Sequence, residues 1–261
     1  MPPVNRQYSL ALEALAELKV EVQTPHPEPL PIAPALTAVL AELGSFPREA
    51  LFLGIASDGL PVLLNLHDPV PGPVLIAGDA GVGKTTFLTS IARAVELTHK
   101  TSEVKFGVIT DHVDEWEAVR NSLHCLGIFS SHDTSGQDFL LSLASWAHGS
   151  ARGAQSMLLL IDDLDAVAKF DFNALQILRW LLSRGPSRRV WPFITLNAAR
   201  YGQVISWIPN FRTRIFGRIR DARFAGALGG DIASALDTLQ AGIQFSLRES
   251  GSWLRFWLPS S

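Results

Sequence analysis

The feature that most constrains the fold is an apolar run that enters a glycine-rich loop and then a helix-like stretch. Residues 74–77 are followed by Gly78-x-x-x-x-Gly83-Lys84-Thr85, with a third glycine at position 81. Glycines let the backbone turn around an anion with its N–H groups pointing inward, and the helix that follows places its N-terminus at the same phosphate. The order strand, loop, helix predicts a phosphate-binding loop rather than a chance glycine-rich turn.

The positions of this loop can be matched to the parts of a nucleotide. Lys84 would reach the β- and γ-phosphates as a mobile point charge, and the Thr85 hydroxyl would bind Mg²⁺ held by the same oxygens. The predicted nucleotide-binding residues form one continuous run, namely Gly78, Asp79, Ala80, Gly81, Val82, Gly83, Lys84, Thr85 and Thr86.

Length and composition fit a globular protein that has no membrane partner. The chain has 261 residues, of which 47% are hydrophobic, and its longest apolar run, 157–161, is far too short to cross a bilayer. The N-terminus lacks a basic stretch followed by an apolar segment, so we expect a cytoplasmic location. Cys125 is the only cysteine, which excludes an internal disulfide and a cysteine-rich metal site.

The net charge of −3 conceals an uneven distribution of charge along the chain. The stretch 179–223 contains ten arginines, no lysine, no glutamate and one aspartate, a net charge of +9 that leaves −12 for the remainder. Such a stretch can offer a basic face to a polyanion such as DNA. Alternatively, the arginines lie over helices and pair with the acidic half of the chain.

The N-terminal part is predicted to be an appendage. Residues 7–22 place apolar side chains at helical spacing, and five prolines between positions 25 and 34 form a stiff spacer. The helix would dock on the core, on a neighbouring subunit or on a partner protein, or serve as a plain intramolecular strut. We therefore expect two parts: residues 1–48, with this helix, the spacer and a short helix over 35–43, and residues 49–261, the domain that carries the phosphate loop.

From residue 74 onward, apolar strands and helices alternate. Strands are predicted over 74–77, 105–110, 125–129, 157–161 and 190–196, and helices near 85–98, 114–122, 135–147 and 172–184. This alternation predicts an α/β fold in which helices cover both faces of a mainly parallel sheet, with small hairpins over 51–66 and 242–258. Ligands of such sheets gather beyond the carboxyl ends of the strands, where the phosphate loop, Asp111, Asp162 and Asn197 all lie.

Two carboxylates at the tip of an apolar strand predict the catalytic end of the site. The strand 157–161 is followed by Asp162-Asp163, the pattern called Walker B. Asp162 would hold Mg²⁺, and Asp163 would polarise the attacking water. Glutamate usually occupies the second position, and the shorter aspartate predicts slow turnover. Paired acids can also cap the next helix, a role for which Asp165 competes.

Several longer segments resemble the FtsK/HerA translocase ATPases, from about Leu51 to Pro259. The resemblance rests on the phosphate loop after an Asp-Gly hairpin and on the segments 158–163, 181–185, 193–197, 210–215, 220–223 and 241–259. The two Walker motifs are generic to P-loop ATPases. The segment Asn210-Phe-Arg-Thr-Arg-Ile215 is the more specific match.

The resemblance implies a P-loop NTPase fold of the RecA-like, ASCE type, with ATP and Mg²⁺ as cofactors. It also implies a hexamer or other homo-oligomer that hydrolyses ATP between subunits and pulls duplex DNA through its pore. Asn197 falls at the position of a γ-phosphate sensor, and Arg220 and Arg223 are candidates for an arginine finger that reaches a neighbour's ATP. Arg214 matches the arginine of Thr-Arg-Ile, and Arg200 lies near a Gln-Arg-Pro element whose proline is missing here. Surface or structural pairing is the alternative for each arginine.

Two classes of function follow from these features. The first is a Mg²⁺-dependent ATPase motor that acts on DNA. The second is a nucleotide-dependent interaction module with slow or no hydrolysis, whose protein partner binds the N-terminal helix or the exposed side chains of Trp253 and Trp257. A small-molecule kinase is a distant third, because no lid or acceptor signature is present. His112 would either approach the nucleotide or be an ordinary loop histidine.

Overall fold

The computed structural model describes residues 34–44, 46–149, 155–230, 235–249 and 252–260. The helix predicted over 7–22 and all but the last proline of the spacer lie outside the described residues. Contacts divide the chain into Met1–Ile32 and Ala33–Ser261, a division that falls before the boundary at residue 48 that we expected. Within the described residues, no helix combines the length and the apolar character that a membrane crossing needs.

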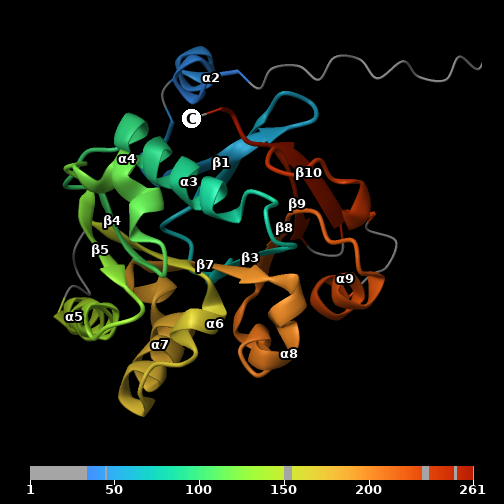
Figure 1. Cartoon of the computed structure of the whole chain (residues 1–261). Helices are drawn as coiled ribbons and strands as arrows, with labels where there is room; N and C mark the ends of the chain where they lie inside the picture. Colours follow the sequence, from blue (N-terminus) through green and yellow to red (C-terminus); the bar gives the residue numbers. More distant parts are fainter. Residues whose placement is uncertain (1–33, 45, 150–154, 231–234, 250–251, 261) are drawn as a thin grey trace, which may run out of the picture. The chain divides into compact units, whose positions relative to one another are not determined.

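The described strands of the second unit form one ten-stranded sheet in the order β2-β1-β10-β9-β8-β3-β7-β6-β4-β5 (Figure 1). Their bounds are β1 Ala50–Ala56, β2 Pro61–Asn65, β3 Val74–Gly78, β4 Val104–Thr110, β5 Cys125–Ser130, β6 Ser156–Asp162, β7 Val190–Asn197, β8 Thr213–Phe216, β9 Gln244–Glu249 and β10 Ser252–Trp257. Six neighbouring strands, from β8 to β5, run parallel. The predicted P-loop fold is therefore confirmed, and β7 lies between the loop strand β3 and the strand β6.

The two predicted hairpins belong to this same sheet. β1 pairs with β2 and with β10, and β10 pairs with β9, all in antiparallel fashion. β8 joins the two halves because it pairs in parallel with β3 and antiparallel with β9. The sequence prediction missed β8. The strand has only four residues, and apolar side chains do not alternate along it.

Helices cover both faces of the sheet, as predicted (Figure 1). The described helices are α2 Leu36–Leu43, α3 Lys84–Thr98, α4 Glu117–Arg120, α5 Ser135–Gly149, α6 Leu164–Val167, α7 Phe172–Arg184, α8 Tyr201–Val204 and α9 Ala222–Gly229. Successive strand residues point to opposite faces, so Val74 and Ile76 pack in the core with α3 and α4, whereas Leu75 and Ala77 pack in the core with α5 to α9. The central strands are thus buried on both faces, and polar side chains reach solvent at their ends.

Helix α2 packs on the antiparallel side of this unit. Its buried residues Leu36, Val39 and Leu40 form a cluster with Phe52 of β1 and Ala94 of α3. The backbone next to α2 also pairs with the C-terminal segment, because the Leu36 N–H donates to the Ser260 carbonyl at 2.8 Å. The short helix that we grouped with the N-terminal appendage is therefore part of the second unit.

Candidate functional site

The loop between β3 and α3 has the backbone conformation that its glycines permit. Gly81 and Gly83 have φ angles of +71° and +86°, values that cost an L residue about 1–2 kcal/mol. A Cβ at Gly83 would also lie 2.8 Å from the Gly242 Cα, so this position tolerates no side chain. Gly78 and Val82 are buried, and the residues between them are partly or fully exposed. The loop therefore presents its central backbone to an incoming ligand.

Lys84 lies over this loop at the first position of α3. Its Nζ donates to the Gly78 carbonyl at 3.2 Å and to the Asp79 carbonyl at 2.7 Å. Burial lowers the pKa of Lys84, and the negative charges of Asp163, Asp162 and Asp79 oppose that shift. The ammonium is thus close enough to the two carboxylates at the end of β6 to interact with both.

One hydroxyl of the neighbouring strand β7 bonds to the carboxylate of Asp162 and to the backbone of Asp163. Thr195 Oγ1 donates to Asp162 Oδ1 at 2.9 Å and accepts the Asp163 N–H at 2.8 Å. Asp163 has φ 92° and ψ 111°, a backbone conformation that non-glycine residues rarely adopt and that is typical of functional sites. Asp163 Oδ1 accepts the Asp165 N–H at 3.4 Å. Asp163, and not Asp165, therefore caps the short helix α6.

The environment of Asp163 favours its protonated form. Burial, the hydrogen bond with the Asp165 side chain and the charge of Asp165 raise the pKa of Asp163 to about 7, against the lowering effects of the Asp165 N–H and of Lys84. Asp165 in turn lies 3.7 Å from Arg200 Nη1, measured from Oδ2. A carboxyl whose pKa lies near neutral pH is suited to accept and release a proton.

Asn197 is the last residue of β7, at the same edge of the sheet. In the parallel register of β3 and β7 it pairs with Gly78, the first residue of the loop. Its Oδ1 accepts the Ala199 N–H at 3.2 Å and so caps the turn that follows β7. The fold thus brings Asn197 beside the phosphate loop, with its side-chain oxygen in a local hydrogen bond. The role of γ-phosphate sensor, which the resemblance implies, stays a prediction.

Two C-terminal segments hold the backbone of the loop. The Asp79 N–H donates to the Arg218 carbonyl at 2.9 Å, and the Gly242 N–H donates to the Val82 carbonyl at 3.1 Å. Asp79 Oδ2 accepts the Arg220 N–H at 3.1 Å. Asp79, which we predicted as a nucleotide-binding residue, therefore has a bracing role in this structure. No sequence signal linked the loop to positions 218 and 242.

The predicted arginines differ in their surroundings. Arg223 pairs with Asp221 at 2.7 Å on the surface, and Arg214 donates to the carbonyls of Phe211, Ile208 and Leu228. Arg220 is exposed, and among the described residues its guanidinium has no hydrogen-bond or ion-pair partner. Arg214 thus has the structural role that the sequence analysis gave as the alternative for each arginine. Arg220 is available for an interaction outside its own chain.

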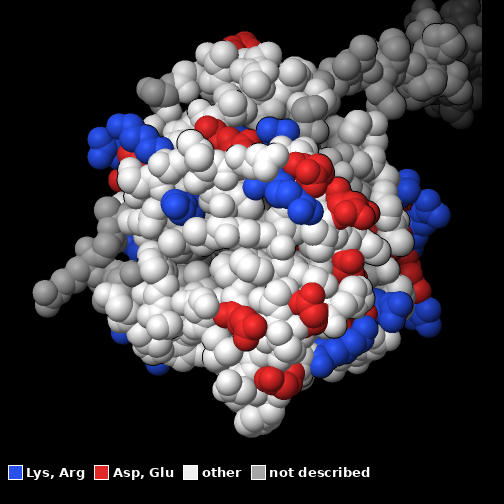
Figure 2. All heavy atoms as spheres, turned by 60° about the vertical axis from the view of Figure 1, so that its left-hand side comes forward, with Lys and Arg blue, Asp and Glu red and all other residues white. Residues whose placement is uncertain are grey.

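The arginine-rich stretch does not supply a uniform set of free charges. Arg179, for example, lies over the Trp207 ring at 4.7 Å, and Arg200, Arg214 and Arg223 have the partners given above. The face in Figure 2, which brings the left side of Figure 1 forward, shows acidic and basic side chains scattered among uncharged atoms. That face carries no continuous basic patch.

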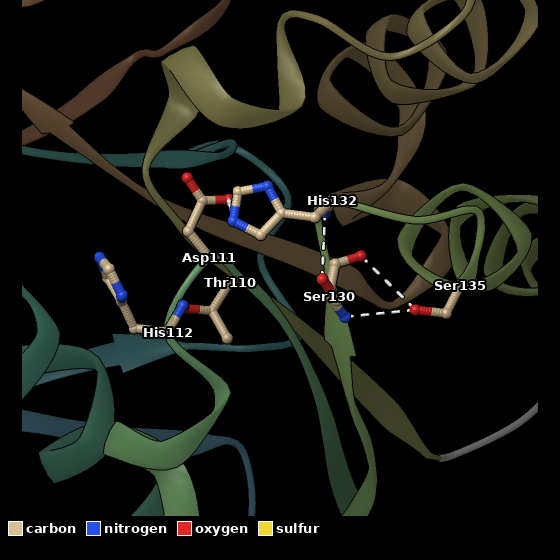
Figure 3. Close-up of polar contacts among 6 residues, drawn as sticks. All are labelled: Thr110, Asp111, His112, Ser130, His132 and Ser135. Atoms are coloured by element: carbon tan, nitrogen blue, oxygen red, sulfur yellow. Dashed lines mark hydrogen bonds and ion pairs between the residues drawn. The ribbon is translucent and has the colours of Figure 1, made fainter.

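The loops after β4 and β5 begin at the same sheet edge as the site, because Thr110 pairs with Asp162 and with Ser130. Figure 3 shows the polar side chains of these two loops. Asp111 Oδ1 is 3.8 Å from His132 Nε2, and these two residues line a polar cavity of about 300 Å³. The His112 N–H donates to Thr110 Oγ1 at 3.0 Å, and its ring lies apart from the Asp111–His132 pair in Figure 3. His112 is therefore held in this loop by its backbone.

The two tryptophans that we expected to be exposed are half-buried. The Trp253 ring packs on the Phe216 ring of β8, with centroids 5.4 Å apart. Trp253 thus contributes to the interior under α9 instead of offering an open surface to a partner.

Comparison with models of protein families identifies the family to which the chain belongs. A family model described as "AAA ATPase domain" matches residues 60–194, a span that includes the phosphate loop, Asp162 and Asp163. The chain belongs to the AAA ATPase domain family. Comparison with curated proteins finds no match.

Solved structures similar to this AAA ATPase domain protein agree with the fold. The cytoplasmic domain of the Thermomonospora curvata type VII secretion ATPase EccC is 15% identical with a TM-score of 0.69, covering 87% of this chain and 32% of that one. EssC (ATPases 2 and 3) from Geobacillus thermodenitrificans is 14% identical with a TM-score of 0.71, covering 88% and 47%. The pCW3 conjugation coupling protein TcpA with ATPγS is 12% identical with a TM-score of 0.64, covering 80% and 65%.

These neighbours are ATPases of the FtsK/HerA type, so the resemblance noted in the sequence is confirmed at the level of the fold. This chain spans between about a third and two thirds of their lengths.

Proposed function

We propose that this AAA ATPase domain protein binds ATP with Mg²⁺ and hydrolyses it at the carboxyl edge of the parallel strands. One observation carries the proposal: the phosphate loop with Lys84 follows β3, and Asp162 and Asp163 lie at the end of β6, at the same edge of the sheet with only β7 between the two strands. A phosphate bound by the loop would therefore lie between a cation and the carboxylates, the arrangement that phosphoryl transfer to water requires.

The residues at this edge fit Mg²⁺ that is bound together with a nucleotide. Among the described residues, no group of three or more His, Cys, Asp or Glu could hold a metal without other ligands. One carboxylate, Asp162, and one hydroxyl, Thr85, are instead the small set of oxygen donors with which Mg²⁺ is bound when phosphates and water complete its shell. When bound, the ion would neutralise charge that develops on the phosphate oxygens.

The side chains of the site then have distinct roles. The loop N–H groups would bind phosphate oxygens, and the Lys84 ammonium would exchange the carbonyls of Gly78 and Asp79 for the β- and γ-phosphates. Asp163 would orient the attacking water and accept its proton, and Asn197 would contact the γ-phosphate. Because the pKa of Asp163 is about 7, its carboxylate is a stronger base than that of an ordinary aspartate.

The finer proposal is a homo-oligomeric ring, a hexamer or other, that acts on DNA. The fold shared with FtsK/HerA-type ATPases supports it. The exposed guanidinium of Arg220 supports it as well, because it could act as an arginine finger that contacts ATP bound to a neighbouring subunit. Arg223 is a weaker candidate because Asp221 already pairs with it. A cytoplasmic location and a partner protein for the N-terminal helix remain part of this proposal.

A second candidate function is a nucleotide-dependent assembly module with slow or no hydrolysis. The short side chain of Asp163 and its bond to the Asp165 N–H favour it, because both keep the carboxylate close to its own backbone.

An ATP turnover assay on size-fractionated protein, with and without duplex DNA, tests these proposals. We expect Lys84→Ala to abolish turnover, whereas Lys100→Ala, which changes an exposed lysine beyond the end of α3, keeps it. Full turnover in Lys84→Ala would overturn the site assignment. If the protein stays monomeric with ATP and DNA does not stimulate its turnover, the DNA motor is excluded. A protein that stays monomeric with ATP also contradicts the nucleotide-dependent assembly module.

A further inference from the structure

Thr195 is a buried polar residue on β7 to which the proposed reaction has so far given no role. It is 1% exposed and lies opposite Ile76 in the register of β3 and β7. Trp191 and Phe193, which precede it at alternate positions, pack in the core under α3, so Thr195 faces the same side of the sheet as the helix that begins at Lys84. A hydroxyl in this setting needs hydrogen-bond partners.

Both partners of this hydroxyl belong to the pair of carboxylate residues at the end of β6. A threonine hydroxyl has one proton to donate, and here it is donated to Asp162 Oδ1 at 2.9 Å. The oxygen lone pairs remain available, and one accepts the Asp163 N–H at 2.8 Å. One side chain on β7 thus fixes a carboxylate at one residue and a peptide group at the next.

The second bond acts at the most strained backbone position near the site. Asp163 has φ 92°, and a residue stays in such a conformation only where its surroundings hold it there. The bond from its N–H to Thr195 holds the peptide that leads into this turn. The turn decides where the Asp163 carboxylate points, and the first bond decides which oxygen of Asp162 stays free.

We propose that Thr195 is a positioning residue that orients Asp162 toward Mg²⁺ and Asp163 toward the attacking water. This inference rests on the proposed function of the site. Removing a group that holds a metal ligand by a hydrogen bond typically lowers metal affinity or activity about 10–100-fold. A hydroxyl that only filled the core would leave metal affinity unchanged.

The test measures Mn²⁺ binding, as a probe for Mg²⁺, to the protein saturated with a non-hydrolysable ATP analogue. We expect Thr195→Val, which keeps the shape and removes both hydrogen bonds, to weaken Mn²⁺ binding about 10–100-fold. Binding of the analogue without metal should stay the same, because the phosphate loop is intact. Thr195→Ser restores the hydroxyl and should recover most of the lost Mn²⁺ affinity.

Thr213→Val is the matched control. It makes the same substitution at the start of β8, where Thr213 Oγ1 donates to the Pro71 carbonyl at 2.7 Å, and β8 pairs there with Val74 at the opposite end of β3. We expect it to leave Mn²⁺ affinity unchanged while it lowers the melting temperature. Should Thr195→Val not fold, Thr195→Ala takes its place with the same expected loss of Mn²⁺ affinity.

Wild-type Mn²⁺ affinity in Thr195→Val, or in Thr195→Ala, would overturn the positioning role while the proposed function stands. Failure of Thr195→Ser to restore affinity would overturn it as well. No Mn²⁺ binding by the wild-type complex would overturn the metal site itself and, with it, this inference. Because the measurement needs no hydrolysis, slow turnover through Asp163 does not affect the result.

Discussion

At the scale of single residues, the site depends on a carboxyl group that the fold holds at a cost. Asp163 combines a φ of 92° with a pKa raised to about 7 by burial and by Asp165. Residues that destabilise the folded state in this way are typical of functional positions. A different residue would make the fold more stable at such a position, so stability does not explain the residue that is present. Function and stability should therefore respond in opposite directions when Asp163 is replaced.

Replacing Asp163 with Asn tests this opposition. A folded-state pKa above the unfolded value of 3.8 means that protonated Asp163 stabilises the fold at low pH, and that this contribution is lost as the pH rises from about 4 through about 7. At pH 8 we expect Asp163→Asn to raise the free energy of unfolding by about 1–3 kcal/mol and to reduce ATP turnover strongly. Near pH 4 the two proteins should be equally stable in denaturant titrations. Equal stability at pH 8 would contradict the raised pKa of the buried Asp163 carboxyl.

The same pKa predicts the pH dependence of hydrolysis. Only the ionised form of Asp163 can accept a proton from water, so kcat/KM for ATP should rise with pH and level off above about 7. In Asp163→Glu, whose longer side chain extends the carboxylate away from the Asp165 N–H, we expect the midpoint of this limb to move. If the rise of kcat/KM with pH keeps the same midpoint in Asp163→Glu, the group that titrates is not residue 163.

At the scale of elements, the short strand β8 holds the two halves of the sheet together. It pairs with the loop strand β3 on one side and with β9 on the other, and the chain that leaves it bonds to Asp79 of the loop. Arg214 of β8 donates to three carbonyls, among them that of Leu228 in α9. Arg214, which matches the arginine of the family's Thr-Arg-Ile segment, here connects strand β8 to helix α9.

Arg214→Leu should therefore act on stability more than on chemistry. Loss of three hydrogen bonds from a charged donor to buried carbonyls predicts a decrease of about 2–4 kcal/mol in the free energy of unfolding. ATP affinity of the protein that remains folded should be close to that of the wild type. Arg212→Leu, at an exposed neighbour, is the control and should change stability by less than about 0.5 kcal/mol. Unchanged stability in Arg214→Leu would argue for a role outside the subunit.

The glycines of the loop allow a sharper comparison within one element. Gly81 and Gly83 both have positive φ, but a Cβ at Gly81 meets nothing within 4 Å, whereas one at Gly83 meets the Gly242 backbone at 2.8 Å. Gly81→Ala should cost about 1–2 kcal/mol in stability, and Gly83→Ala clearly more. Thermal unfolding of both variants, with ATP binding as a second readout, measures the difference. Equal costs would contradict the close approach of residue 242.

At the scale of the whole molecule, the sequence predicted what depends on local pattern and missed what depends on long-range pairing. The phosphate loop, the strand with Asp162 and Asp163 and the helices on both faces follow from glycine spacing and apolar periodicity. β8, the joining of both hairpins to one sheet and the bonds from Thr195 connect positions far apart in the chain, so no local pattern marks them. The helix over 7–22 lies outside the described residues and stays a prediction.

A ring with shared sites predicts complementation between two inactive proteins. Arg220→Ala keeps an intact phosphate loop, and Lys84→Ala keeps an intact Arg220. If Arg220 reaches a neighbour's ATP, each variant alone should lose turnover, and a mixture of the two should recover part of it because mixed oligomers contain complete sites. Turnover of the mixture that stays at the level of the separate variants, in oligomers shown to exchange subunits, would place Arg220 outside the site.

The backbone of the loop is bonded to residues 218 and 242, which flank the same end of the antiparallel β8–β9 pair, after the last residue of β8 and before the first residue of β9. A ligand that reshapes the loop must therefore lengthen or break these bonds, or carry both segments along with it. Strands β8 and β9 would then serve as a lever arm whose pivot is the occupied pocket. Through β10 and β1 they would transmit its displacement to β2 at the far edge of the sheet.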